Sequence, residues 1–323
     1  MTHAIRIHEQ GGPEVMKWEE VDVAAPGPGQ VSIAHTAVGL NYIDCYHRSG
    51  LYPLPMPAGI GMEAAGIVEA VGDGVTSVNT GDRVAYAAGP PGSYAEKRVI
   101  EAAKVVKLPD DISDETAAAM MLQGMTVEYL IRRTYAVKSG DIVLFHAAAG
   151  GVGLIACQWL KQIGATVIGT VGSDEKAAIA QAHGCDHPIV YTRENFPERV
   201  REITGGKGVP VVYDSIGNDT YQGTLDCLSP RGMFVSFGNA SGPIKNFDVG
   251  QLAAKGSLYL TRPSLVSYTS TPADLKESAT ALFDAVARGL KIEINQRYAL
   301  QDAAQSHRDL EGRKTTGSTI LLP

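Results

Sequence analysis

The glycine-rich stretch 146–153 is the segment of the sequence with the clearest capacity for chemistry. It follows the apolar run 142–145 and reads His-Ala-Ala-Ala-Gly-Gly-Val-Gly. In the spacing G-x-G-x-x-G, Ala148 takes the first place, Gly150 the second and Gly153 the third. The second glycine of this pattern lets the backbone approach a pyrophosphate, and the third lets a helix pack closely on a strand.

A helix is expected to begin in the same stretch, as a phosphate-binding turn requires. A helix that begins near Val152 directs unpaired N–H groups and its positive dipole end toward an anion. We therefore predict that Gly150, Gly151 and Val152 bind the phosphates of a dinucleotide. A turn that serves packing alone is the alternative, and the strands and helices that follow favour the binding site.

The end of the next predicted strand distinguishes the two nicotinamide cofactors. An NAD site needs a carboxylate there, about 20 residues after the glycines, to bind the ribose hydroxyls. Gly172 and Ser173 occupy that place, Lys176 follows, and Tyr191 ends the neighbouring strand. A cation without a carboxylate favours a 2′-phosphate, and hence NADPH. In one alternative, Ser173 only caps a helix and Lys176 is a solvated helix residue. In another, the strand ends later than predicted and Asp174 binds the ribose.

The elements around the glycine stretch alternate between strand and helix. Strands are predicted at 142–145, 165–171, 189–191, 209–213 and 233–237, with a sixth at 258–260. Helices are predicted at 154–163, 174–183, 198–203 and 220–228. Alternation at this spacing implies βαβ units and a parallel sheet covered on both faces.

The flanking segments have a different pattern. Residues 1–125 are β-rich, with short runs at 31–38, 66–71 and 83–86 between Gly, Pro and Asp turns, and a helical run at 115–130. The last 60 or so residues have the same mixed pattern, with helices at 272–288 and 301–311 and strands at 292–298 and 318–322. The simplest arrangement is an α/β domain, residues 126–262, inserted into a discontinuous β-rich domain, residues 1–125 plus 263–323.

Composition and charge exclude several classes of protein. The chain has 323 residues, of which 44% are hydrophobic and 20% charged, so a disordered chain is excluded. A net charge of -7 argues against nucleic acid or an anionic membrane as the main partner. The four cysteines are far apart, which predicts buried thiols in a reducing, cytoplasmic compartment; Cys45 is the one to test for reactivity. We expect no signal peptide and no membrane span.

Six segments carry a family resemblance. They are the signature 141–161, the motif Gly61-x-Glu63-x-x-Gly66-x-Val68 continuing to 81–84, and the segments 41–44, 48–53, 235–238 and 261–264. Together they resemble the medium-chain dehydrogenase/reductase superfamily and, within it, the zinc-free NADPH:quinone oxidoreductases related to zeta-crystallin. The resemblance runs nearly end to end. It implies a Rossmann-type doubly wound parallel sheet inserted in a discontinuous GroES-like barrel domain.

The resemblance also implies a set of site residues. It places the stretch 41–52 at a mouth facing the nicotinamide, where Asn41, Tyr46 and Tyr52 would position the substrate, and the first two would also touch the cofactor. Further cofactor contacts are expected from Tyr129, Ser215, Phe237, Gly238, Asn239, Ser241, Arg262, Ser264 and Arg313. The alternatives are a helix cap for Asn41, a pocket wall for each tyrosine, and surface ion pairs for the arginines.

The same relatives suggest chemistry without a metal. In zinc alcohol dehydrogenases a Cys, a His and a second Cys hold the catalytic zinc, and the matching places here are Asn41, Met62 and Gln123. None of these supplies a thiolate or an imidazole, so we expect no metal, and alcohol oxidation is disfavoured.

Reduction of a quinone by NADPH is the expected function. Reduction of activated C=C bonds in enals or enones, and a non-enzymatic NADPH-binding structural or RNA-binding role, are alternatives. The family implies a homodimer, through an edge strand near 257–260.

Overall fold

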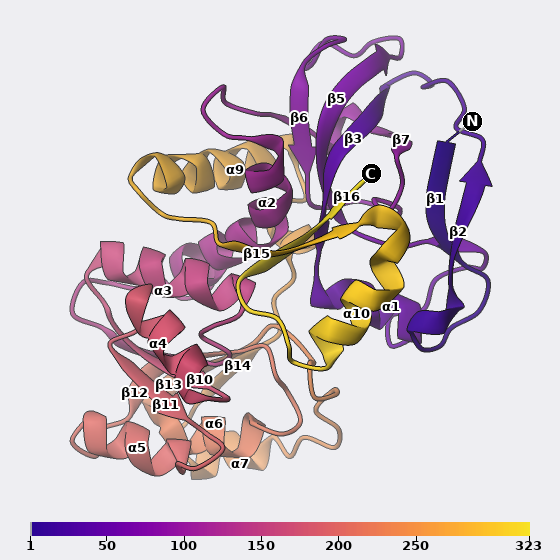
Figure 1. Cartoon of the computed structure of the whole chain (residues 1–323). Coiled ribbons are helices and arrows are strands. Elements are labelled where there is room, and N and C mark those ends of the chain that lie inside the picture. Colours follow the sequence, from indigo (N-terminus) through magenta and orange to yellow (C-terminus); the bar gives the residue numbers. More distant parts are fainter. Residues whose placement is uncertain (1) are drawn as a thin grey trace. The chain divides into compact units, whose positions relative to one another are not determined.

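The computed structural model describes residues 2–323, which form two compact units (Figure 1). The first unit contains the chain up to Met125, Tyr268–Asp284 and Ile292–Pro323. The second contains Thr126–Ser267 and Ala285–Lys291. The domain limits expected from the sequence, 126–262 within 1–125 plus 263–323, differ slightly from these units and stay a prediction.

The second unit is built on a parallel sheet of six strands in the order β11-β10-β9-β12-β13-β14. The strands are β9 (Ile142–Phe145), β10 (Thr166–Val171), β11 (His187–Val190), β12 (Val209–Asp214), β13 (Leu228–Ser236) and β14 (Tyr259–Thr261). All five pairings are parallel. The strand order reverses at β9, as in a doubly wound Rossmann sheet, so the predicted parallel sheet and its sixth strand are confirmed.

The helices of this unit follow the strands in sequence. They are α3 (Gly151–Ile163), α4 (Asp174–Ala182), α5 (Phe196–Ile203), α6 (Tyr221–Cys227) and α7 (Gly250–Ala254), with α8 (Leu265–Tyr268) near its end. Figure 1 shows them in magenta to orange around the strands. A π-helical turn, η3 (Tyr129–Thr134), precedes β9. Side chains such as Leu144, Ile168, Val212 and Phe234 form the core between sheet and helices.

The first unit contains a seven-stranded sheet with the order β15-β16-β3-β5-β6-β8, in which β7 also pairs with β3. These strands are β3 (Gln30–Leu40), β5 (Glu63–Val71), β6 (Arg83–Tyr86), β7 (Lys97–Glu101), β8 (Val106–Lys107), β15 (Ile294–Ala299) and β16 (Ser318–Leu322). A smaller sheet joins β2 (Met16–Val21), β1 (Thr2–Ile7) and β4 (Ala58–Gly59). Because β16 pairs with β3, the start and the end of the chain build one domain, as predicted.

Four longer helices and three short turns complete the first unit. The helices are α1 (Tyr42–Ser49), α2 (Asp114–Glu128), α9 (Pro272–Ala287) and α10 (Ala303–Glu311), and the last residues of α2 and α9 belong to the second unit. The 3-10 turns are η1 (Pro13–Val15), η2 (Ala102–Lys104) and η4 (Leu300–Asp302). Asn41 is the N-cap of α1, which confirms the alternative interpretation of this residue as a cap.

Two glycines of the β9–α3 turn meet different surroundings. A Cβ atom built on Gly153 would lie 2.3 Å from the carbonyl oxygen of Ala147, closer than any real contact. A Cβ atom on Gly150 would lie 3.3 Å from the same oxygen and near nothing else within 4 Å. Gly153 is therefore required for α3 to pack on β9, whereas Gly150 leaves its backbone open.

We predict that Gly153→Ala lowers the free energy of unfolding by about 1–3 kcal/mol, because the added methyl group collides with backbone. Gly150→Ala should lose clearly less, since Gly150 has φ −79° and its added methyl group would make a single tight contact, at 3.3 Å, with the carbonyl oxygen of Ala147. Urea denaturation followed by circular dichroism measures both. An equal loss in the two variants would contradict the packing argument.

Candidate functional site

The turn between β9 and α3 presents backbone rather than side chains. Ala147 has a positive φ of 55°, and the N–H of Ala148 donates to the carbonyl of Thr170 at 3.0 Å, which fastens the turn to β10. Gly150 caps α3 without a side chain, and the first helical hydrogen bond runs from Leu154 to Gly150 at 2.8 Å. The positive end of α3 is thus open for an anion to approach. This is the geometry predicted for the glycine stretch.

The end of β10 lies beside this turn and carries the predicted cofactor-selecting residues. β10 ends at Val171, and Ser173 caps α4 by accepting the N–H of Lys176 at 3.3 Å. A Cβ atom on Gly172 would lie 3.1 Å from the Tyr191 hydroxyl, so that hydroxyl lies over Gly172. The structure therefore brings Gly172, Ser173 and Tyr191 together at one strand end.

Asp174 is the first residue of α4 and is paired with a base. Arg193 donates to both of its carboxylate oxygens at 2.6 Å. These hydrogen bonds lower the pKa of Asp174. Because β10 has already ended at Val171, the alternative in which a later strand end presents Asp174 to a ribose is wrong.

The loop after β12 is organised by Asp214, which sequence reasoning missed. Its buried carboxylate accepts the N–H groups of Ile216 and Gly217 at 2.7 and 3.1 Å and the hydroxyls of Thr220 and Thr224 at 2.7 and 3.1 Å. The available signal was an acidic residue directly after a buried apolar run. Asp214 acts as the internal cap that shapes the loop after β12.

This loop contacts the loop after β13 and gathers several predicted residues. A Cβ atom on Gly238 would lie 2.5 Å from the carbonyl of Ser215, so the two backbones touch. The N–H of Ser241 donates to the carbonyl of Ile216 at 2.8 Å. Phe237 packs against Phe145, with ring centroids 5.8 Å apart. Ser215, Phe237, Gly238, Asn239 and Ser241 therefore lie together at the carboxyl edge of the sheet.

The remaining residues predicted from the resemblance lie at separate places. Tyr129 is buried at the start of η3, and Arg262 and Ser264 are exposed after β14. Arg313 is exposed after α10 in the first unit, with a positive φ of 58°. Their contacts with a cofactor stay predictions.

His146 lies beside the glycine stretch but is fully engaged. Its two ring nitrogens lie 2.8 Å from the hydroxyl of Thr170 and 2.9 Å from that of Thr224. Burial lowers its pKa, so the ring is neutral. These contacts support the structural role expected for this residue.

In the first unit, Asn41 is held at the N-terminus of α1 by two neighbours. Its amide nitrogen donates to Glu63 at 2.6 Å, and its amide oxygen accepts from Gln123 at 3.3 Å. Glu63 also accepts the backbone N–H of Leu122 at 2.7 Å. Burial raises the pKa of Glu63 to about 8, although both hydrogen bonds oppose the change. Sequence reasoning placed Glu63 only within a motif and gave it no role.

The predicted tyrosines form an aromatic cluster with their neighbours on α1. The ring of Tyr46 lies 5.5 Å from that of Tyr42 and 5.2 Å from that of Tyr52. His47 adds an edge contact to Tyr52 at 6.1 Å. Tyr46 is buried and Tyr52 is partly exposed. The structure therefore brings Tyr46 and Tyr52 together, whereas their roles toward a substrate stay predictions.

A buried polar network anchors α1 to α10. Arg48 donates to both carboxylate oxygens of Glu311, at 3.0 and 2.7 Å, and to Nδ1 of His307 at 3.0 Å. Because a guanidinium only donates, Nδ1 accepts, and Nε2 carries the proton toward the hydroxyl of Tyr94 at 3.0 Å. Burial lowers the pKa of His307 to about 3. Tyr94 in turn donates to Asp44 at 2.9 Å.

Asp44 ends this network as a buried carboxyl with one idle oxygen. Its Oδ2 accepts the N–H of Asn41 at 2.9 Å as well as the Tyr94 hydroxyl. Its Oδ1 is buried without a hydrogen-bond partner among residues 2–323. Burial raises the pKa of Asp44 to about 7. The cluster therefore favours a protonated carboxyl at acidic pH.

The expectation that Cys45 deserves a reactivity test is not supported by its surroundings. Its side chain is 2% exposed, and burial raises its pKa. Its sulfur lies 3.5 Å from Nδ1 of His307. A buried thiol that resists ionisation is a poor nucleophile. All four cysteines are buried and unpaired, as predicted.

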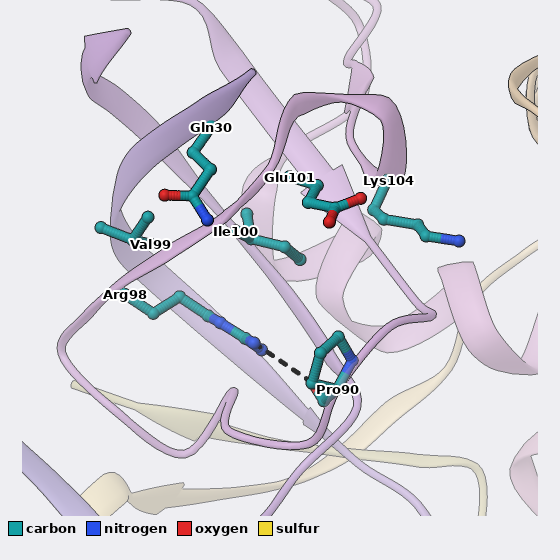
Figure 2. Close-up of a pocket in the computed structure, with 7 residues that line it drawn as sticks. All are labelled: Gln30, Pro90, Arg98, Val99, Ile100, Glu101 and Lys104. Atoms are coloured by element: carbon teal, nitrogen blue, oxygen red, sulfur yellow. Dashed lines mark hydrogen bonds between the residues drawn. The ribbon is translucent and has the colours of Figure 1, made fainter. Parts of the chain in front are cut away.

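One surface pocket lies away from all these residues. It has a volume of about 220 Å³ and is lined by residues of β3, β7 and nearby turns, including Arg98, Ile100 and Lys104 (Figure 2). Arg98 donates to the carbonyl of Pro90 at 3.1 Å. None of the predicted site residues lines it, so we assign it no part in the site.

Comparisons with known proteins agree with this geometry. Residues 27–110 match the family model of the alcohol dehydrogenase GroES-like domain, and residues 151–284 match that of zinc-binding dehydrogenases. The chain is 54% identical to a quinone oxidoreductase of Pseudomonas aeruginosa and 48% identical to a 2-haloacrylate reductase of a Burkholderia species, over 100% of this chain and at least 99% of each relative. The crystal structure of the Escherichia coli quinone oxidoreductase complexed with NADPH superposes with a TM-score of 0.98, at 50% identity, covering 99% of this chain and 100% of that one.

The chain belongs to the quinone oxidoreductase family. It is thus a member of the medium-chain dehydrogenase/reductase superfamily, with the Rossmann-type sheet and GroES-like domain that the resemblance implied. Among residues 2–323, no helix is long and apolar enough to cross a membrane.

The donor set of this family member does not fit zinc, although one matching model is named for it. The places that hold the catalytic metal in zinc relatives carry Asn41, Met62 and Gln123, which are two amides and a thioether. Structural and catalytic zinc sites use thiolates, imidazoles and carboxylates instead. Within the described residues 2–323, no three His, Cys, Asp or Glu side chains are grouped to hold a metal ion.

The raised pKa of Asp44 predicts a pH dependence of stability. Its carboxyl has a usual pKa of 3.8, and about 7 in the folded state, so between these values the folded protein keeps a proton that the unfolded chain releases. The contribution of Asp44 is therefore fully present below about pH 3.8 and lost as the pH rises to about 7.

Asp44→Asn cannot ionise and removes this dependence. We expect the free energy of unfolding of the wild type, minus that of the variant, to fall by up to about 1.4 kcal/mol per pH unit between pH 5 and 7. Urea denaturation at several pH values measures the difference. Parallel profiles would show that Asp44 titrates normally.

Proposed function

We propose that this chain reduces quinones with NADPH and uses no catalytic metal. The observation that carries the proposal is the carboxyl edge of the parallel sheet. There the N-terminus of α3, which has no side-chain cap, lies beside a strand end that offers Ser173, Lys176 and Tyr191 but no unpaired carboxylate. The whole-length identity to named quinone oxidoreductases supports the choice of substrate.

The residues at this edge fit NADPH. Gly150 leaves its backbone open, so the N–H groups of Gly150, Gly151 and Val152 would hold the pyrophosphate. Ser173, Lys176 and Tyr191 would hold the 2′-phosphate, with Gly172 giving it room beside the Tyr191 hydroxyl. The relative from Escherichia coli was crystallised with this cofactor. Bound NADPH would supply a hydride to the acceptor.

The chain itself would bind, orient and polarise the acceptor. Quinone reduction places charge on an oxygen, which a hydrogen-bond donor stabilises. Asn41 has one amide hydrogen beyond the one that Glu63 accepts, and we propose that this hydrogen serves the quinone oxygen. Tyr46 and Tyr52 would form an aromatic wall for a flat substrate.

A second acceptor class is favoured by one specific relative. The 2-haloacrylate reductase, at 48% identity, acts on a compound with an activated C=C bond according to its name. An enal, enone or haloacrylate would need the same delivery of hydride and a similar hydrogen-bond donor at its oxygen. The acceptor alone distinguishes this candidate from quinone reduction.

A turnover assay tests the function. We expect the chelator-treated protein to oxidise NADPH with 1,4-naphthoquinone, and to prefer NADPH to NADH by about tenfold in kcat/KM. Activity with 2-chloroacrylate or an enal but not with the quinone would favour the second candidate. Activity that disappears with chelator would overturn the metal-free proposal, and tight NADPH binding without turnover would favour a non-enzymatic role.

The cofactor preference depends on Lys176. We expect Lys176→Glu to raise the KM for NADPH about tenfold or more, because a charge-assisted contact is replaced by repulsion, while the KM for NADH changes little. Lys207→Glu, on an exposed loop of the same unit, is the matched control. Steady-state kinetics with both cofactors measure this, and equal effects would remove the assignment.

We also propose a homodimer that pairs β14 with a second copy. β14 is the last strand of its sheet, and Tyr259 and Leu260 are 59% and 38% exposed there. An exposed apolar edge strand is suited to pairing with another strand. Tyr259→Asp should convert a dimer into a monomer in gel filtration with light scattering; a wild-type monomer would refute the proposal.

Buried, unpaired cysteines fit a reducing compartment, so we propose that the enzyme acts in the cytoplasm. The net charge of -7 argues against a nucleic acid as its main partner.

A further inference from the structure

One continuous chain of side-chain hydrogen bonds crosses the interior of the first unit. Asn41 donates to Glu63 at 2.6 Å, Gln123 donates to Asn41 at 3.3 Å, and Ser318 donates to Gln123 at 2.9 Å. The four residues are 0 to 7% exposed. Water therefore has little access, and the members must satisfy one another.

Backbone groups fix the two ends of this chain. The N–H of Leu122 donates to Oε1 of Glu63 at 2.7 Å and can never accept. The carbonyl of Ala119 lies 2.9 Å from Oγ of Ser318 and can never donate. Ser318 has one hydroxyl proton but two acceptors at 2.9 Å, the carbonyl of Ala119 and Oε1 of Gln123.

Two arrangements of protons satisfy every link among these four side chains, and the second gives up the contact of the Asn41 side chain with the N–H of Asp44 in the capping box of α1. With Glu63 ionised, Asn41 turns its NH₂ group to Glu63, Gln123 turns its NH₂ group to Asn41, and Ser318 donates to Gln123. With Glu63 protonated on the oxygen facing Asn41, both amides turn over. Glu63 then donates to the amide oxygen of Asn41, and Ser318 donates to Ala119. The hydrogen bonds that link the four side chains therefore run in one direction when Glu63 is ionised and in the opposite direction when it is protonated.

We propose that Glu63 is a positioning residue that decides, through this chain, whether Asn41 presents an N–H group or a carbonyl oxygen to a substrate. The proposal rests on the function proposed above, in which the second amide hydrogen of Asn41 serves the quinone oxygen. In the ionised arrangement Asn41 is a donor there. In the reversed arrangement it is an acceptor, which would repel developing negative charge.

The surroundings of Glu63 suit this role. Burial raises its pKa to about 8, so both forms are accessible near neutral pH. Asp44 on α1 also raises the pKa of Glu63, and Glu63 in turn raises the pKa of Tyr86 on β6. Gly39 makes room for it, because a Cβ atom there would lie 2.5 Å from Oε2 of Glu63 and 2.1 Å from the carbonyl of Ala118.

The variant Glu63→Gln should reverse the direction of these hydrogen bonds, while the new side chain keeps almost the size and shape of glutamate. The fixed N–H of Leu122 must keep an oxygen, so the new NH₂ group at position 63 must face Asn41. Asn41 then turns its oxygen to position 63. We expect kcat with 1,4-naphthoquinone to fall about tenfold at about pH 9, while the KM for NADPH stays within about twofold.

The pH profile separates this effect from a structural one. Wild-type kcat should rise through about pH 8 as Glu63 ionises, whereas the Glu63→Gln profile lacks this step. The ratio of wild-type to variant kcat should therefore approach one at about pH 6. A ratio that does not change with pH would overturn the proposal. Glu69→Gln, on the same strand and ion-paired with Lys97 at the surface, is the matched control.

A double variant separates the direction of the chain from the loss of a buried charge. Glu63→Gln combined with Gln123→Glu restores one carboxylate but keeps Asn41 reversed, because its NH₂ group now faces position 123. We expect its kcat at about pH 9 to stay as low as that of the single variant. Recovery of wild-type kcat would show that the charge matters and the direction does not.

Neutron diffraction from deuterated crystals provides a readout that needs no turnover. At about pH 9 we expect the Asn41 deuterons of the wild type on the Glu63 side, and those of Glu63→Gln on the Gln123 side. The same orientation in both would overturn the proposal. If the wild type reduces no quinone, the proposed function fails, and the diffraction result still decides whether Glu63 sets the direction.

Discussion

The close approach of α3 to β9 is the constraint on which the cofactor-binding unit depends. At Gly153 the helix backbone comes so near to the turn that no side chain fits between them. Gly169 on β10 and Gly238 after β13 repeat the principle, since a Cβ atom on either would lie within 2.6 Å of a neighbouring group. Glycines therefore let neighbouring segments of this unit pack closely, and the turn after β9 keeps a backbone without side chains, which suits the approach of a pyrophosphate.

The first unit differs in that its helix α1 buries polar side chains. Asp44, His47 and Arg48 are buried on α1, and such groups are costly to bury unless they are hydrogen-bonded. The bidentate contact of Arg48 with Glu311 and the contact of Asp44 with Tyr94 offset that cost. The helix that carries Tyr46 is thus held by directional polar contacts, which fix its orientation more strictly than apolar packing would.

The sequence predicted the parallel sheet well and the polar interior poorly. Strand β9 is a short apolar run bounded by turns, and its limits agree with the prediction, whereas β13 begins at Leu228 and not at the predicted residue 233. α1 was not recognised as a helix, because five of its eight residues are buried and polar groups are among them, which leaves no apolar periodicity. Asp214 and Glu63 each lie next to a recognised element, but their partners are set by tertiary contacts. The contact between Gln123 and Ser318 joins residues 195 positions apart, beyond the reach of any local pattern.

The pairing of β16 with β3 has a consequence for biogenesis. Strand β3 can pair early with β5 and β7, but it gains its partner β16 only when Thr319, Ile320 and Leu321, which pair with Leu40, Gly39 and Val38, have left the ribosome. The Rossmann sheet is encoded wholly in between and can close earlier. A nascent chain should therefore contain a folded Rossmann sheet while the β3 edge of the other sheet still lacks β16. A peptide fused after Pro323 would slow the final pairing of β16 with β3.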